Sequence, residues 1–248
     1  MKLPDAAVAL FWIFVVIAAW AIAIPVFDIP KYILPSPETI AGRIASRPEY
    51  FLSATASTLA LIAIGFCSGL LVAIPMAFAL AKIKLLERAL YPLIVFTQTM
   101  PLIAVIPILV IWAGYGLVST SILVAFSVFF PVLVNGVAGL KSTPARLYFV
   151  TRTMGASPFQ TLRYVDWFIA LPYLLGGLRI SLAVATAVAI ISEYIASNEG
   201  LGFAALIGLR NRDPVQIISV VLIAATLGVV LNTGSLFLEK KMLKRYQD

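Results

Sequence analysis

The feature that most constrains this chain is a set of long runs without a charged side chain. Residues 6–24, 51–81, 89–140 and 214–238 contain no Asp, Glu, Lys or Arg, and these runs are 19, 31, 52 and 25 residues long. A helix that crosses the hydrocarbon core of a bilayer needs about 20 apolar residues. Because the runs are continuous rather than alternating, they predict membrane-spanning helices and not the strands of a barrel.

The composition leads to the same class of protein. Hydrophobic residues make up 62% of the 248 residues and charged residues only 12%, whereas soluble domains are about half apolar and a quarter charged. The absence of His excludes imidazole metal sites and His-containing catalytic triads. Cys67 is the only cysteine, so no disulfide can form within the chain.

The 52-residue run is too long for one span, and the segment 114–121 (GYGLVSTS) predicts a turn between two helices. A further apolar run, residues 167–192, is interrupted only by Arg179. We therefore predict an all-α integral membrane protein, one transmembrane domain over residues 1–248, with about six transmembrane helices. The expected helices cover residues 6–25, 54–81, 89–113, 118–140, 170–195 and 215–238.

The first of these helices could instead be a secretory signal, because Lys2 precedes it and residues 21–23 (AIA) form a small-x-small site. The apolar core of a signal is usually about 7 to 15 residues long. The 19-residue run exceeds this length, which favours a retained helix.

Lys and Arg in the connections indicate the orientation. With six spans and the amino terminus inside, 13 of the 18 basic residues fall on the cytoplasmic side and five (Lys31, Arg43, Arg47, Arg210 and Arg212) on the outside. Cytoplasmic loops carry an excess of Lys and Arg. Both termini are therefore predicted to be cytoplasmic, and the net charge of +7 is explained by topology. A nucleic-acid partner is not expected.

One cytoplasmic connection, residues 141–171, is long for a link between helices. Residues 145–154 predict a short helix that Gly155 ends. Ser157, Pro158 and Gln160 then form the pattern of a capping box, with Pro at the first helical position. A second short helix is expected from there to about Val165.

This second helix would present apolar and aromatic side chains, namely Phe159, Leu162 and Tyr164, beside Arg residues. Such a surface suits insertion into a groove on a partner protein. It equally suits an amphipathic hairpin that lies on the lipid headgroups. The residues alone leave both interpretations open.

Several ordered segments resemble one family. They are YILPSPETI (32–40), TQTMPLIAVIPILVIWAGYG (97–116), FFPVLVNGVAGL (129–140), RTMGASPFQTLRYV (152–165), ALPYLLGGLRIS (170–181) and SEYIASNEGLGF (192–203). They are similar to permease subunits of binding-protein-dependent ABC importers, in the subfamily that imports nitrate, sulfonates, taurine and thiamine-pyrimidine precursors. The resemblance covers most of the chain from Tyr32 to about Phe203.

The resemblance implies a type I ABC importer permease fold in the bacterial cytoplasmic (inner) membrane, which carries a small anionic or organic solute. It implies three partners: cytoplasmic ABC ATPase subunits, an extracytoplasmic solute-binding protein, and a second permease copy in a homodimer. Residues 141–171 would be the loop that docks on the ATPase, and we call them the coupling loop. The implied ATPase-coupling residues are Arg152, Met154, Gly155, Ala156, Ser157, Phe159 and Leu162.

The coupling loop departs from the family pattern, which reads Glu-Ala-Ala, three residues, Gly, nine residues and then Ile-x-Leu-Pro. Phe149, Val150 and Thr151 stand where Glu-Ala-Ala is expected, and residues 165–168 (VDWF) replace Ile-x-Leu-Pro. Gly155 is kept, and a Leu-Pro pair follows four residues late, at 171–172. We expect the geometry of the loop to be preserved, with one polar contact to the ATPase missing.

The chain contains no Gly-x-x-x-x-Gly-Lys-Ser/Thr sequence, the motif that cradles ATP phosphates. We therefore expect a transport subunit rather than an enzyme, with no cofactor of its own and with ATP bound by the partner subunit. Residues 200–205 (GLGFAA) match a dinucleotide-binding pattern, but they are interpreted as a turn on the outer side. Glu193 and Glu199 flank that turn without a partner base.

Polar residues within the spans are candidates for a translocation path, because polarity inside a membrane is costly and often functional. The candidates are Gln98, Asn135, Arg179 and Glu193. The alternative is that the uncharged ones only join helices by hydrogen bonds, and Arg179 could extend to the headgroups instead of attracting an anion. A secondary transporter without an ATPase partner is the alternative function, although the halves show no internal repeat.

Overall fold

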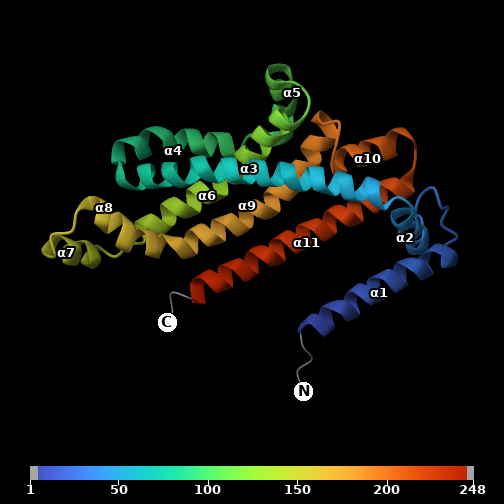
Figure 1. Ribbon diagram of the computed structural model, residues 1–248, viewed down its shortest axis with the longest axis horizontal. Helices are drawn as coiled ribbons and strands as arrows, with labels where there is room; N and C mark the ends of the chain where they lie inside the picture. Colours follow the sequence, from blue (N-terminus) through green and yellow to red (C-terminus); the bar gives the residue numbers. More distant parts are fainter. Residues whose placement is uncertain (1–4, 245–248) are drawn as a thin grey trace.

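The computed structural model describes residues 5–244, and every regular element in that range is a helix (Figure 1). Lys2 and Arg245, which the topology argument placed in the cytoplasm, lie outside the described residues. The elements are α1 (Asp5–Val26), α2 (Pro37–Ser46), α3 (Pro48–Lys82), α4 (Lys84–Gln98), α5 (Leu102–Ala113), α6 (Leu117–Lys141), α7 (Ala145–Thr153), α8 (Pro158–Thr161), a π-helix (Leu162–Asp166), α9 (Trp167–Ala196), α10 (Leu201–Arg210) and α11 (Pro214–Lys244).

The predicted class, an all-α integral membrane protein, is confirmed. Within residues 5–244, four continuous helical stretches are long and apolar enough to cross a membrane, namely α3, α6, α11 and the stretch Pro158–Ala196 that contains α9. The α4–α5 pair adds a fifth candidate if the two helices form one bent span. The remaining predicted helix corresponds to α1, whose described apolar part, Phe11–Val26, is shorter than these spans.

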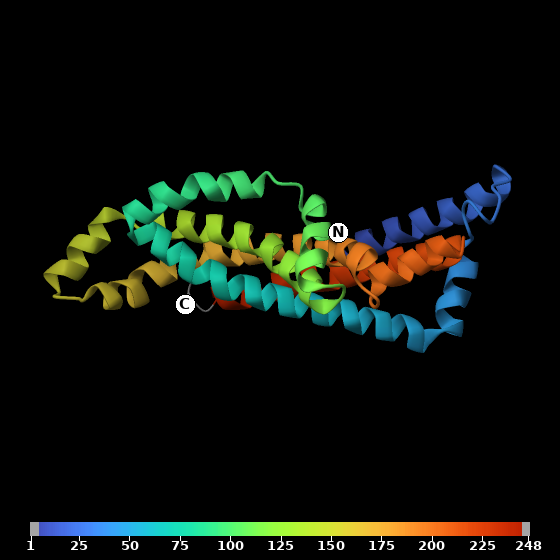
Figure 2. The ribbon, with the colours of Figure 1, turned by 90° about the horizontal axis from the view of Figure 1, so that it is seen from above.

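The centre of the bundle is formed by α3, α6 and α9, which lie side by side in both views (Figures 1 and 2). The backbones of α3 and α6 approach closely because glycine residues of α3 face α6. A Cβ at Gly65 would lie 2.5 Å from the Cβ of Val124, and one at Gly69 would lie 2.7 Å from the carbonyl oxygen of Ala125. Close backbone approach at small residues is how membrane helices gain packing energy in the absence of a hydrophobic driving force.

One end of the molecule carries α7 and α8, and the opposite end carries α2 and α10 (Figure 1). The carboxyl end of α3 and the amino end of α4 lie toward α7, as does the carboxyl end of α11. At the opposite end, Phe51 of α3, Leu201 and Ala204 of α10, and Val220 of α11 form a separate buried cluster. The long helices therefore connect two structured ends.

Arg43 of α2 and Asp213, in the link between α10 and α11, form an ion pair at that second end. Burial raises the pKa of Asp213, but the hydrogen bonds it accepts from Arg43 and from the backbone N–H of Gln216 outweigh burial and hold the pKa below its ordinary value. The pair fixes α2 to the start of α11.

The prediction of one helix over residues 89–113 is wrong, because the helix is broken in the middle. The chain there forms two helices, α4 and α5, that meet at an angle of 98°. Pro101 supplies the reason, because proline has no N–H to donate and disfavours helical backbone at the residue before it. The apolar run hid this break, since Thr99–Pro101 carries no charge.

Two other expectations need correction. The second short helix of the coupling loop does not end near Val165, because α8 passes through the π-helix into α9 without a break. Residues 200–205 were interpreted as an outer turn, whereas the chain from Leu201 to Arg210 forms α10. Gly200, at a φ of 95°, makes the turn that precedes α10.

Candidate functional site

The coupling loop leaves α6, runs through α7, reverses at Gly155 and returns through α8. Gly155 has a φ of 69°, a left-handed conformation that an L side chain rarely adopts. The predicted capping box is present: the Ser157 hydroxyl accepts from the Gln160 amide at 3.2 Å, and the Ser157 amide donates to Gln160 Oε1 at 2.8 Å. The cap fixes the first turn of α8 directly after the reversal.

The surface of this loop is apolar and open. Phe149, Met154, Phe159 and Tyr164 are each about two-thirds exposed or more, at 68%, 79%, 67% and 65%. Of the seven predicted coupling residues, Arg152, Met154, Gly155, Ser157 and Phe159 are exposed, and Ala156 and Leu162 are half-buried. A concentration of exposed aromatic and apolar side chains outside a bilayer marks an interaction surface.

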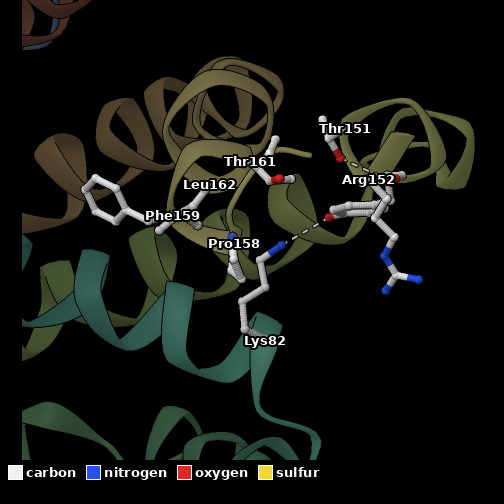
Figure 3. A pocket seen from close by; sticks show the side chains of 9 residues that line it. Lys82, Thr151, Arg152, Pro158, Phe159, Thr161 and Leu162 are labelled. Atoms are coloured by element: carbon white, nitrogen blue, oxygen red, sulfur yellow. Dashed lines mark hydrogen bonds between the residues drawn. The ribbon is translucent and has the colours of Figure 1, made fainter. Parts of the chain in front are cut away.

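A cavity of about 500 Å³ lies between the two arms of the loop and the end of α3. Figure 3 shows Lys82 reaching from α3 into this region, with Arg152 on one side and Pro158 and Leu162 on the other. The remaining lining residues are Tyr148, Thr151, Ala156, Phe159 and Thr161. Four of the seven predicted coupling residues, Arg152, Ala156, Phe159 and Leu162, thus line one cavity.

Beneath this surface lies a polar cluster that the sequence did not indicate. Asp166, the last residue of the π-helix, is fully buried, and three side chains donate to its carboxylate. Lys82 Nζ pairs with Oδ2, while Tyr148 OH and Thr143 Oγ1 donate to Oδ1 at 2.7 and 3.2 Å. Lys82 also donates to Tyr148 OH at 3.1 Å and lies over its ring.

The energetics of Asp166 require these partners. A buried carboxylate is strongly unfavourable unless it is paired and hydrogen-bonded. Its partners are distant along the chain, Lys82 being 84 residues away. A sequence pattern could not have revealed the pairing, although an isolated Asp before a long apolar run is the signal that could have drawn attention to residue 166.

The three predicted path residues whose side chains are described, Asn135, Arg179 and Glu193, do not form one cluster. Asn135 is half-buried in α6 and donates to the carbonyl of Pro131 at 2.7 Å, one turn earlier. Arg179 is exposed on α9, and within the described part of the chain it makes no ion pair. The side chain of Gln98 lies outside the described part of the structure.

Glu193 lies near the opposite end of α9, and it is only 2% exposed. Thr58 Oγ1 and the backbone N–H of Gly202 both donate to its Oε2, at 2.8 and 2.9 Å. The amide of Leu201 donates in turn to Thr58 Oγ1 at 2.8 Å. This network ties the start of α10 to α3 and α9, so Glu193 has hydrogen-bond donors that the sequence analysis did not identify.

Solved structures share this arrangement of helices. The permease chain of the inward-facing methionine ABC transporter superposes with a TM-score of 0.68, over 79% of this chain and 97% of that chain, at 19% identity. At this identity the likeness establishes the fold alone. The fold is therefore that of type I ABC importer permeases.

Residues 69–247 match the family of binding-protein-dependent transport system inner membrane components, and the chain belongs to this family. It is 36% identical to the riboflavin transport system permease protein of Chloroflexus aurantiacus, over 74% of this chain and 69% of that protein. It is 34% identical to the formylaminopyrimidine transport permease protein of Halalkalibacterium halodurans, over 85% and 84%. The resemblance found in the sequence is confirmed.

Proposed function

We propose that this chain is the permease subunit of an ATP-driven importer that carries a small organic or anionic solute. The observation that carries the proposal is the coupling loop, which presents an exposed apolar surface and continues without a break into the spanning helix α9. A movement imposed on α8 would reach the bundle through a continuous helical backbone. Membership of the importer family supports the same role.

The partners follow from the two ends of the molecule. We assign the α7–α8 end to a cytoplasmic ABC ATPase, because its exposed Phe, Met and Tyr side chains suit a partner groove. The excess of Lys and Arg predicted for this side supports a cytoplasmic location, with both termini inside. The α2–α10 end would then receive solute from an extracytoplasmic binding protein, and a second copy of the chain would complete the path.

The proposal also assigns ATP hydrolysis and solute passage to different subunits. The sequence has no phosphate-binding loop for ATP, so the ATPase partner would bind and hydrolyse the nucleotide. This chain would contribute the path and the mechanical response. Relatives named for riboflavin and formylaminopyrimidine transport support a small organic solute.

Among the predicted path residues, Arg179 is the best placed to meet a solute. Its guanidinium lies on an exposed face of α9, so a second copy packed against that face would enclose it. Asn135 and Gln98 remain candidates for the same path. We assign Glu193 to closure of the outer end, because its carboxylate already accepts hydrogen bonds from Thr58 and Gly202.

The test is purification of the tagged chain with its ATPase subunit. Phe159→Asp should abolish co-purification, because a carboxylate in an apolar contact costs about 2 kcal/mol or more at a central interface position. Phe27→Asp is the matched control, since Phe27 is similarly exposed, at 74%, but lies between α1 and α2. Retention of the ATPase by the Phe159 variant, at the level of the Phe27 variant, would contradict the assignment of the docking surface.

A further inference from the structure

The polar cluster below the coupling loop has a role that the docking surface does not explain. We infer that Asp166 is a positioning residue that joins the coupling loop to α3, so that the loop and the end of α3 move as one body. The inference rests on the proposed function, because it concerns how a movement of the docked loop enters the bundle.

The contacts of Asp166 come from each segment that meets at the base of the loop. Lys82 is the last residue of α3, Thr143 lies in the link from α6 to α7, and Tyr148 belongs to α7. The carboxylate itself belongs to the segment that leads into α9. Apart from Asp166, α3 contacts the loop through the hydrogen bond from Lys82 to Tyr148 and through Phe78, which stacks on Trp167. Asp166 is the residue whose bonds join all of these segments at one point.

Lys82 is therefore the polar link to α3, beside the apolar stacking of Phe78 on Trp167. The bond from Tyr148 and the bond from Thr143 both hold segments of the loop itself, whereas the Lys82 ammonium is the donor that comes from another spanning helix. Its side chain is 40% exposed and lines the cavity between the loop and the end of α3. A displacement of the loop would pull on α3 through this contact.

The π-helix explains how Asp166 reaches this position. A π-turn holds one more residue than an α-turn and occurs frequently at functional sites. One extra residue shifts the helical phase by about 100°. The five-residue π-helix Leu162–Asp166 therefore sets the rotational position of α8 relative to α9, and it places the Asp166 side chain toward the interior while Tyr164 faces outward.

A second ion pair at the same end of the molecule provides a comparison. Lys141 of α6 pairs with Glu87 of α4, and both side chains are partly exposed, at 44% and 30%. This pair links α4 to α6, and the hydrogen bond between the two side chains does not involve α7 or the π-helix. Its removal should leave the loop attached to α3, which makes Glu87→Gln the matched control.

The informative variant is the double substitution Lys82→Met with Asp166→Asn. A single Lys82→Met change would leave an unpaired buried carboxylate and endanger folding. In the double variant the neutral amide can still accept from Tyr148 and Thr143, so the loop keeps its internal bonds and loses its polar link to α3. The double variant therefore tests the positioning role of Asp166 without leaving a buried carboxylate unpaired.

The experiment uses the full chain, with Cys67→Ala, in complex with its ATPase. Spin labels at Thr153 of α7 and Lys84 of α4 report the distance between the loop and the end of α3, because both positions are exposed and Lys84 follows α3 within two residues. A fluorophore at Leu52, 72% exposed near the other end of α3, reports the response to ATP and vanadate.

The parent chain and Glu87→Gln should give one narrow distance distribution, unchanged by ATP and vanadate, together with a fluorescence response at Leu52. The double variant should retain the ATPase and its thermal stability, while the distribution widens and the Leu52 response falls by at least about fivefold, the lower range of coupling between sites. A narrow distribution and a full response in the double variant would overturn the inference.

Failure of the proposed function would give a different result. If the parent chain does not bind the ATPase, the docking assignment is wrong. The label distances measured without nucleotide would then still decide whether Lys82 and Asp166 hold the loop to α3.

Discussion

At the scale of single residues, the coupling loop requires glycine at position 155 because of its backbone conformation and not because of neighbouring atoms. The φ of Gly155, 69°, lies in the left-handed region, yet no neighbouring atom lies within 4 Å of where a Cβ would be. A substitution there is opposed by the backbone conformation and not by crowding. The coupling loop thus depends on glycine for the direction in which α8 leaves the reversal.

We therefore expect Gly155→Val to weaken ATPase binding while membrane insertion stays normal. The left-handed conformation costs a non-glycine residue about 1 to 2 kcal/mol, and relief of that strain would redirect α8. Gly155→Asn should retain more binding, since Asn tolerates this conformation. Titration of the detergent-purified variants with the ATPase measures the effect, and equal affinity of Val and Gly at this position would contradict the explanation.

The ion pair between Arg43 and Asp213 predicts a dependence of stability on pH. The pKa of Asp213 is lower in the folded chain than its ordinary value because the Arg43 guanidinium and the Gln216 amide outweigh the effect of burial. A lowered folded-state pKa contributes stability above the unfolded pKa of about 3.9, and that stability is lost as the pH falls through the folded pKa.

Melting temperatures should accordingly fall more steeply below about pH 4 in the parent chain than in Asp213→Asn, which lacks the titrating group. At neutral pH the variant should melt lower, by the equivalent of about 1 kcal/mol or less, as expected of a partly exposed pair. Thermal unfolding in detergent across this pH range checks both statements. Parallel curves for the two proteins would show that the pair does not contribute.

At the scale of helices, the α3–α6 contact depends on glycine for space. Gly69→Ala places a Cβ 2.7 Å from the backbone oxygen of Ala125, which cannot move without displacing α6. Overpacking of this kind costs about 1 to 3 kcal/mol. Gly234→Ala in α11 is the control, because a Cβ there meets nothing within 4 Å. We expect Gly69→Ala to lower the melting temperature and Gly234→Ala to leave it unchanged.

The long helices could be predicted because a bilayer demands long apolar runs, and such runs are visible residue by residue. The break at Thr99–Pro101 was missed because apolarity alone does not register a proline that ends a helix. Short helices were harder to predict. Ser36 and Pro37 carry the cap signal of α2, but α2 is too short to form a run, and α10 follows a glycine that indicated only a turn.

The structure of the coupling loop could be predicted where it depends on residues that are close in sequence. Gly155, Ser157 and Gln160 are close in sequence, and the reversal and the capping box follow from their spacing. The contacts of Asp166 and Glu193 join residues 84 and 135 positions apart. Such contacts are created by helix packing, and one sequence does not contain the information needed to pair them.

At the scale of the whole molecule, one axis connects the proposed docking end to the proposed solute-receiving end. The stretch Pro158–Ala196 runs from the α8 cap to the region of Glu193 as continuous helix. At about 1.5 Å per residue its 39 residues extend for nearly 60 Å. Both ends of the permease are thus built on a single element.

This arrangement predicts which residues share a side of the membrane. Single cysteines at Ser157 and Ser36, in a Cys67→Ala background, should react with an impermeant thiol reagent from opposite sides of sealed vesicles. Ser157 lies in the coupling loop, and Ser36 caps α2 at the other end of the molecule. Labelling of both from one side would rule out the proposed topology.

The bend between α4 and α5 leaves backbone amide groups that need water or protein as hydrogen-bond partners. The 15 residues of α4 extend about 22 Å from Lys84, which places Thr99–Pro101 well within the roughly 30 Å hydrocarbon layer. The first amides of α5 receive no side-chain cap, since Pro101 precedes them. Lipid cannot hydrate such groups, and irregular backbone persists at this depth only against protein or beside a water-filled cavity. We therefore expect the aqueous route of the proposed permease to pass beside this bend.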